Sequence, residues 1–116
     1  MFQRLERIRV IMKQYLSPEQ TAKLIELGFA PKMRIKGVCT KYGTVNIEHE
    51  AYFDVGKLIE MLPPIIDEYS SQVISGGGTW SVHYKRIFES RYDTFAKELI
   101  DALYDMIIKL KEEGVI

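Results

Sequence analysis

A few side chains in this sequence could support chemistry, and the first are the two histidines and the single cysteine. His49 lies between Glu48 and Glu50, and a metal site could be drawn from these three with His83 and Cys39. Side chains alternate along a strand, however, so the two glutamates would share one face and His49 the other. The chain also has no HxH, HExxH or CxxC spacing, which is what makes a metal prediction specific. We therefore expect no metal and no cofactor.

Catalytic pairs can be drawn in the same way. Cys39 with a histidine, or Asp67 and Glu68 with His83, would place a nucleophile or a carboxylate beside a base. Any chain of this length offers such pairs, and the sequence has no GxSxG turn to expose a nucleophile. The glycine triplet at 76–78 leads into a strand, which is typical of a hairpin tip rather than a phosphate-binding loop. We therefore expect no catalytic residues, and a protein that is not an enzyme.

Charge is distributed unevenly, although the net charge is zero. Residues 1–45 contain nine Lys or Arg against three acidic residues, and residues 46–116 contain seven against thirteen. The split indicates either a nucleic-acid surface or pairing of the two halves, within the fold or across an oligomer. The nucleic-acid alternative would use the basic side chains of Arg4, Arg7, Arg9, Lys13, Arg34 and Lys36. Internal pairing is preferred, because nucleic-acid binders usually show a domain-wide basic excess.

Length and composition predict one folded domain over residues 1–116. A chain with 47% hydrophobic and 28% charged residues can bury a core and does not resemble a disordered chain. One cysteine rules out an intrachain disulfide and indicates a reducing compartment. The N-terminus carries charges where a signal peptide needs an apolar stretch, and no run is long enough for a membrane span. We expect a cytoplasmic protein that does not contact a membrane.

Two helices are expected at the N-terminal end. Residues 1–16 form a basic amphipathic pattern whose apolar face suits docking on a protein core, as part of the domain or as an appendage to it. The second helix begins with a capping box made by Ser17 and Gln20. Gly28 is placed to end it in a Schellman motif, which needs a left-handed residue at that position.

A first β-hairpin is predicted from residues 32–40 and 44–50, with Gly37 as a candidate bulge. One face would pair the basic residues of the first strand with Glu48 and Glu50, which is cross-strand charge pairing rather than a free basic patch. The opposite face is expected to point inward through Met33, Ile35, Val45 and Ile47.

A short helix, capped by Asp54 and ended by Pro63, should follow this hairpin. Residues 65–71 fit a kinked helix and an extended segment equally well. A second hairpin then joins residues 72–75 to residues 79–88. Alternation along it predicts that Trp80, Val82 and Tyr84 face inward, and that Ser81, His83 and Lys85 face outward.

The strongest periodic signal lies at the C-terminal end. Residues 92–113 carry an apolar stripe at helical spacing, which predicts a helix long enough for a small sheet to pack along. Ser90 or Asp93 would cap this helix, and Gly114 would end it. The predicted fold is therefore α+β in the order ααββαββα, with a small antiparallel sheet of about four strands in two hairpins on the long C-terminal helix.

Tyr104 and Ile108 lie off the main stripe of that helix and widen its apolar arc. Either the first helix packs against this side as well, or the pair is exposed and marks a protein interface. They are the candidate interface residues of the sequence.

Four segments carry a resemblance to known proteins: residues 17–24 with Gly28-Phe29, and residues 58–63, 77–84 and 98–116. In this order they resemble a group of small uncharacterised proteins encoded by phages and prophages of gut bacteria. The resemblance covers residues 17–116, and its motifs are structural, so it supplies no catalytic residues. The chain departs from the group in its basic N-terminal segment and in Met61-Leu62, where an aromatic residue often stands.

The functional prediction is a non-enzymatic accessory protein of the mobile-element type. It would act by binding another protein or a second copy of itself, for example as a homodimer. Nucleic-acid binding through the basic N-terminal half is the first alternative, and an enzyme with an unrecognised site is the second.

Overall fold

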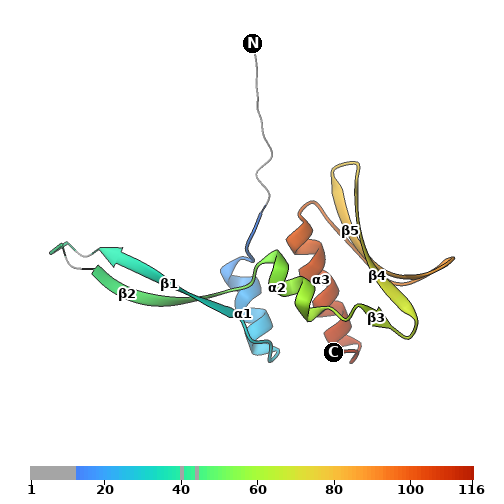
Figure 1. The fold of residues 1–116 in the computed structure, drawn as a ribbon, viewed down its shortest axis with the longest axis horizontal. Helices are drawn as coiled ribbons and strands as arrows, with labels where there is room; N and C mark the ends of the chain where they lie inside the picture. The colour runs from blue at the N-terminus through green and yellow to red at the C-terminus, as the bar shows by residue number, and fades with distance from the viewer. Residues whose placement is uncertain (1–12, 40, 44) are drawn as a thin grey trace, which may run out of the picture.

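The computed structural model describes residues 13–39, 41–43 and 45–116. Within these residues the elements are α1 (Pro18–Glu26), β1 (Lys32–Cys39), β2 (Val45–Tyr52), α2 (Val55–Met61), β3 (Ile65–Ile66), β4 (Tyr69–Gly76), β5 (Thr79–Arg86), β6 (Glu89–Ala96) and α3 (Leu99–Glu112). The fold is α+β with antiparallel sheets and a C-terminal helix, as predicted. The strands form a β1-β2 sheet and a β3-β4-β5-β6 sheet, rather than the single sheet expected. Figure 1 shows the helices between these two sheets.

The predicted caps of α1 are confirmed. Ser17 Oγ accepts a hydrogen bond from the Gln20 backbone N–H at 3.1 Å, and Gln20 Oε1 accepts one from the Ser17 N–H at 3.0 Å. At the other end, Gly28 has a φ of +98°, and the Phe29 N–H donates to the Leu24 carbonyl at 3.0 Å. Local chemistry therefore sets both ends of this helix.

The chain before α1 differs from the prediction. Residues 1–12 of the predicted first helix lie outside the described residues, and residues 13–16 are extended rather than helical. Tyr15 bridges to Asp54 as in an antiparallel ladder, and the Leu16 N–H donates to the Phe53 carbonyl at 3.1 Å. Backbone pairing with the end of β2 therefore replaces helical hydrogen bonds in this segment.

The start of the final helix was also predicted wrongly, because residues 92–96 belong to β6. Tyr92 pairs opposite Tyr84 of β5, and their rings make an edge contact at 6.3 Å between centroids. Aromatic and β-branched side chains favour a strand here, and β6 covers the free edge of β5. Glu98, within the range assigned to the helix, is the N-cap of α3, and the predicted caps lie inside β6: Ser90 and Asp93.

The C-terminal stop of α3 is confirmed. Gly114 has a φ of +77°, and the Val115 N–H donates to the Leu110 carbonyl at 2.9 Å, which is the Schellman closure expected there. The same closure therefore ends α1 and α3.

The β1–β2 hairpin has the predicted pairing but not the predicted environment. Arg34 pairs opposite Glu50, and Gly37 opposite Ile47, in a continuous register, so the expected bulge at Gly37 is absent from the described ladder. The residues predicted to face inward are instead exposed: Met33 at 56%, Ile35 at 68% and Ile47 at 66%. The side chain of Val45 lies outside the described residues. Figure 1 shows the reason, since the hairpin projects away from the helices and α3 packs on the other sheet.

The second predicted hairpin is confirmed as β4 and β5. Gly77 and Gly78 form its turn with φ values of +62° and +79°, which suits the twist of a two-residue hairpin loop. Residues 65–71 take the extended alternative, as β3, a turn at Asp67 and Glu68, and the start of β4. Ser81 and His83 lie on the outer face of the sheet, as predicted, but both are buried, because they lie on the central strand between the side chains of β4 and β6.

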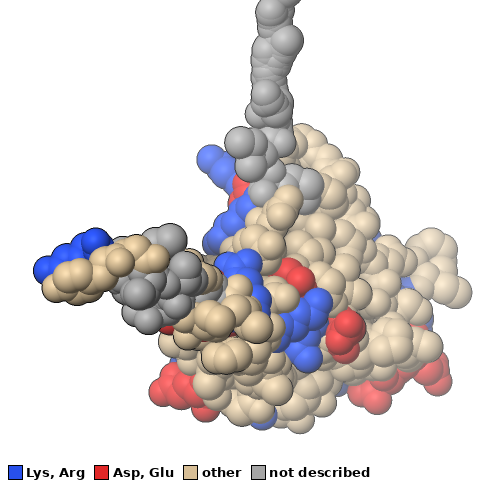
Figure 2. All heavy atoms as spheres, turned by 60° about the vertical axis from the view of Figure 1, so that its left-hand side comes forward, with Lys and Arg blue, Asp and Glu red and all other residues tan. Residues whose placement is uncertain are grey.

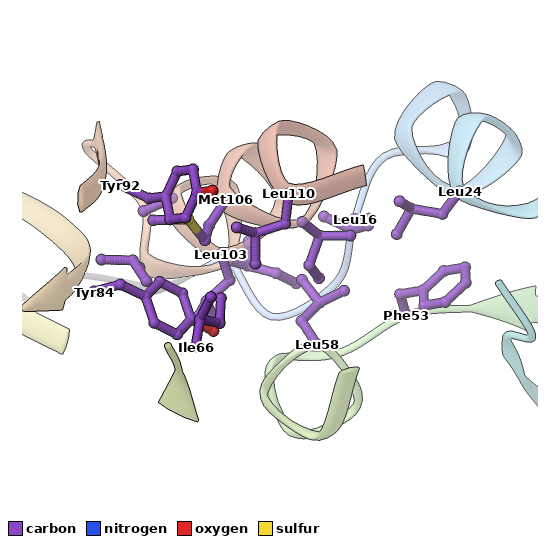
Figure 3. Packing of buried hydrophobic residues seen from close by; sticks show 14 residues of the cluster. Leu16, Leu24, Phe53, Leu58, Ile66, Tyr84, Tyr92, Leu103, Met106 and Leu110 are labelled. Atoms are coloured by element: carbon purple, nitrogen blue, oxygen red, sulfur yellow. The ribbon is translucent and has the colours of Figure 1, made fainter. Parts of the chain in front are cut away.

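The core is built around α3. Figure 3 shows Leu103, Met106 and Leu110 of this helix between the sheet residues Tyr84 and Tyr92 on one side and Leu58 of α2 on the other. Leu24 and Phe53 extend the same core to α1 and to the root of the β1–β2 hairpin. The hydroxyl of Tyr84 donates to the Pro63 carbonyl at 2.6 Å, and burial raises the pKa of Tyr84 to about 12.

The capping box supplies the first testable prediction. Ser17→Ala removes the acceptor for the Gln20 N–H and should lower the free energy of unfolding by about 1 kcal/mol. Urea denaturation followed by circular dichroism measures the change. Ser70→Ala, at an exposed strand position with no side-chain hydrogen bond, is the control and should change stability by less than about 0.5 kcal/mol. Equal losses in the two variants would contradict this account of the helix start.

Candidate functional site

The most exposed apolar surface of a β-strand lies on the β1–β2 hairpin, which we call the arm (residues 32–52). One face of the arm carries Met33, Ile35 and Ile47, and we call these three residues the arm face. An isolated two-stranded hairpin is marginally stable in water, and large exposed apolar patches mark interaction sites. The arm face is therefore the first candidate functional site.

The opposite face of the arm is charged and internally paired. Arg34 Nε donates to Glu50 Oε1 at 2.9 Å, which confirms the cross-strand pairing predicted for this face. The Arg34 guanidinium also lies over the rings of Tyr15 and Tyr52, at 4.7 and 4.8 Å from their centroids. Figure 2 shows basic and acidic side chains interspersed around the base of the arm rather than gathered into one patch.

Asp54, at the root of the arm, ties two elements together. Its carboxylate accepts the Lys57 N–H at 2.8 Å, which caps α2, and lies 3.3 Å from the Lys32 ammonium group. Burial, the largest single influence, opposes ionisation of Asp54, but the hydrogen bonds from Lys57 and Lys32, the positive charge of Lys32 and the Asp54 backbone N–H together lower its pKa. The arm and α2 therefore share one ionised carboxylate.

A groove of about 370 Å³ runs between α1 and the base of the arm. Its walls are partly apolar, from Ile25 and Ala51, and partly charged, from Arg34 and Glu50. Because these two charged groups already pair with each other, the groove offers no unpaired charge from this pair to a ligand. It continues the surface of the arm toward the body of the protein.

The predicted interface residues lie at the margin of the core. Tyr104 and Ile108 are half-buried and pack against the core cluster. Burial raises the pKa of the Tyr104 hydroxyl, with a smaller contribution from the charge of Asp105. Part of the apolar surface that Tyr104 and Ile108 add to α3 is therefore buried against the core of the fold.

The basic residues of the nucleic-acid alternative fall into two groups. Lys13 Nζ lies 2.8 Å from Asp101 Oδ1, and Arg34 pairs with Glu50. The remaining residues, or their side chains, lie outside the described part of the chain: Arg4, Arg7, Arg9 and Lys36. The two candidate side chains that the structure describes, Lys13 and Arg34, therefore pair with acidic residues of the second half of the sequence, in line with the preferred reading of the charge split.

A polar cluster that the sequence did not predict lies on the outer face of the second sheet. His83 Nδ1 lies 2.5 Å from Asp93 Oδ1, and His83 Nε2 lies 2.8 Å from Ser81 Oγ. Ser90 also donates to Asp93, and hydrogen bonds from Ser90 and then His83 lower the pKa of Asp93. The cluster was missed because Asp93 had been assigned to a helix, whereas β6 places it directly opposite His83.

The order of these groups is that of a Ser-His-Asp triad, but their setting differs from that of an acyl-transfer site. Ser81 and His83 lie two residues apart on the central strand, whose backbone groups pair with β4 and β6. Stabilising an oxyanion requires unpaired donors aimed at one point beside the nucleophile. We therefore assign the cluster a structural role, which is to satisfy polar groups buried on the central strand.

The other groups considered for chemistry do not come together in the described structure. No group of three His, Cys, Asp or Glu residues suited to a metal ion occurs among the described residues. His49 is exposed on the arm, away from His83 on the second sheet, and the side chain of Cys39 lies outside the described residues. None of the described helices is long and apolar enough to cross a membrane.

Comparisons of the chain with protein-family models, curated proteins and solved structures found no match. The functional argument therefore rests on the geometry of the arm and of the second sheet.

The polar cluster yields a prediction with a definite pH dependence. Because its folded-state pKa is lowered, ionised Asp93 stabilises the protein above its ordinary pKa of 3.8, and this contribution is lost as the pH falls below that value. Asp93→Asn should therefore destabilise the protein at pH 7, by an amount that shrinks toward pH 3. Urea unfolding at several pH values measures the difference.

Asp105→Asn is the matched control with the opposite sign. Desolvation, and then the charge of Asp101, raise the pKa of Asp105, so its ionised form opposes folding at pH 7. The asparagine variant should be more stable than the wild type at pH 7 and equally stable below pH 3.8. The same sign of change in both variants would contradict the assigned electrostatics.

Proposed function

We propose that this protein is a non-enzymatic binding module that holds a partner protein through its arm. The observation that carries the proposal is the exposure of Met33, Ile35 and Ile47 on one face of a projecting hairpin. Burying a large aliphatic side chain stabilises a complex by about 1.5–3 kcal/mol. Three such residues on one face are therefore enough to anchor a partner.

The size of the arm restricts how the partner can bind. Strands of eight residues extend about 26 Å, and two of them are about 10 Å wide, so one face offers roughly 260 Å². A standard interface buries about 800 Å² per partner. A partner that contacted only the arm face would be held weakly, so we infer that the partner encloses the arm, contacting the apolar face, the tip and the groove beside α1.

The chemistry of the arm also restricts the partner. The cavity that receives the arm face should be apolar except for one polar group beside His49, because that face carries no Lys, Arg, Asp or Glu in its described part and His49 lies on it opposite Ile35. The rim of the partner's cavity should carry polar groups, which suit the opposite face of the arm. On that face Arg34 and Glu50 already neutralise each other. A strongly charged ligand such as nucleic acid is the weaker candidate, since Lys13 and Arg34 are both paired with carboxylates.

A cytoplasmic location fits this proposal, in line with the single cysteine. A phage or prophage origin stays a prediction that is based on the sequence resemblance alone.

The arm can be tested with paired surface variants. Ile35→Ser combined with Ile47→Ser should reduce affinity for the partner at least tenfold, because two anchoring side chains are lost. The measurement is quantitative affinity capture from a lysate of the source organism, with bound proteins compared by mass spectrometry. Stability should change little, because both side chains are exposed.

The matched control is Ile87→Ser combined with Phe88→Ser, at the turn between β5 and β6. These side chains are 89% and 97% exposed, so the control removes more exposed apolar surface than the arm variant does, at a different place. A partner that is lost from the arm variant and kept by the control supports the proposal. Retention of all partners by the arm variant, or the absence of any partner on the wild type, would refute it.

A further inference from the structure

The second sheet has an edge that natural proteins usually protect. On the edge of β4 that faces away from β5, the short β3 pairs only with Tyr69 and Ser70, and no described strand covers the rest. Residues 72–76 of β4 are all exposed. Edge strands normally carry charges, prolines or bulges that prevent pairing with another chain. The sequence of β4, YSSQVISG, has no Lys, Arg, Asp, Glu or Pro.

The free edge presents backbone groups that lack a partner among the described residues. The Ser71 N–H points away from β5, because it donates to the Pro64 carbonyl at 3.0 Å. Backbone groups alternate in direction along an antiparallel strand, so the N–H and C=O groups of Val73 and Ser75 also point toward this edge. Four hydrogen-bonding groups are therefore available to an incoming strand.

From this edge we infer that two copies of the protein pair through β4, antiparallel and about a two-fold axis at Ile74. In this register the backbone of Val73 hydrogen-bonds to that of Ser75 in the second copy, and Ser75 to Val73 of the second copy. Ile74 lies opposite Ile74, and Gln72 lies opposite Gly76. Pairing at β4 would join the four-stranded sheets of the two copies into one sheet, in which each β3 lies end to end with β4 of the second copy.

The absence of charge on β4 is what favours a second copy as the occupant. The same two-fold operation on β1, centred at Ile35, would place Arg34 opposite Lys36. On β2, centred at His49, it would place Glu48 opposite Glu50. Like charges directly opposite each other disfavour both pairings, whereas β4 places only uncharged residues together.

Side chains next to the axis support the same arrangement. Ile74 and Val73 are 43% and 45% exposed, on opposite faces of the sheet. Ser81 separates Ile74 of β4 from the exposed Phe95 of β6 in one row across the outer face. Pairing at Ile74 would join this row to the same row of the second copy in a single apolar stripe. It would also cover the Ile74 side chains of both copies. A contact of this size is at the small end for protein interfaces, so we expect a weak, reversible dimer.

A charge-swap experiment tests the inference. Sedimentation velocity of the full chain from about 5 to 500 µM should show a reversible dimer for the wild type. Ile74→Lys and Ile74→Glu, measured separately, should each weaken association at least tenfold, because like charges meet at the axis. An equimolar mixture of the two variants should restore association. A wild type that is monomeric throughout, an unchanged Ile74→Lys, or a mixture that stays monomeric would overturn the proposal.

Amide exchange provides a second measurement that does not depend on these variants. Exchange at the Val73 and Ser75 amides should slow as the wild-type concentration rises through the dimerisation range, while other exposed amides stay unchanged. Exchange at these two amides that does not depend on concentration would exclude the edge. The arm variant Ile35→Ser with Ile47→Ser should dimerise like the wild type, and its failure to do so would assign self-association to the arm instead.

Discussion

The architecture depends on how one helix is shared. α3 has 14 residues, which corresponds to a length of about 21 Å, and it buries Ile100, Ala102, Leu103, Met106, Ile107 and Leu110. Its buried side chains are covered by the four-stranded sheet and by α2, and no described contact joins this helix to the β1–β2 sheet. Among the described residues, the β1–β2 hairpin meets the core cluster only at its root, where Phe53 follows β2 and is fully buried.

Local chemistry made part of this fold predictable. The capping box at Ser17, the closures at Gly28 and Gly114, and the glycine turn at 77–78 are decided by a few neighbouring residues, and all were found where expected. The start of the last helix was not predicted correctly, because the spacing of Tyr92, Phe95 and Ala96 fits a helix as well as a strand. Tertiary pairing with β5 decided between them.

The sites were less predictable than the elements. Alternation along β1 and β2 correctly shows which residues share a face, but it carries no information on whether another element covers that face. The arm face was therefore expected to be buried. Similarly, Ser81 and His83 could be placed together from sequence, but Asp93 joins them only once β6 is known to be a strand. In both cases the missing information was a contact between segments distant in the sequence.

The Arg34 guanidinium, 4.7 Å from the centroid of the Tyr15 ring, connects the arm to the segment before α1. An exposed cation–π contact contributes about 0.5–1 kcal/mol, whereas the contacts of Arg34 with Tyr52 and Glu50 lie within the arm and do not hold its orientation. A partner that displaces Arg34 from Tyr15 would therefore lose about 0.5–1 kcal/mol, roughly a two- to fivefold change in affinity. The buried Phe53 thus anchors the root of the arm, while the contact of Arg34 with Tyr15 on the surface is weak. Partners that differ in shape can therefore be accommodated without unfolding the core.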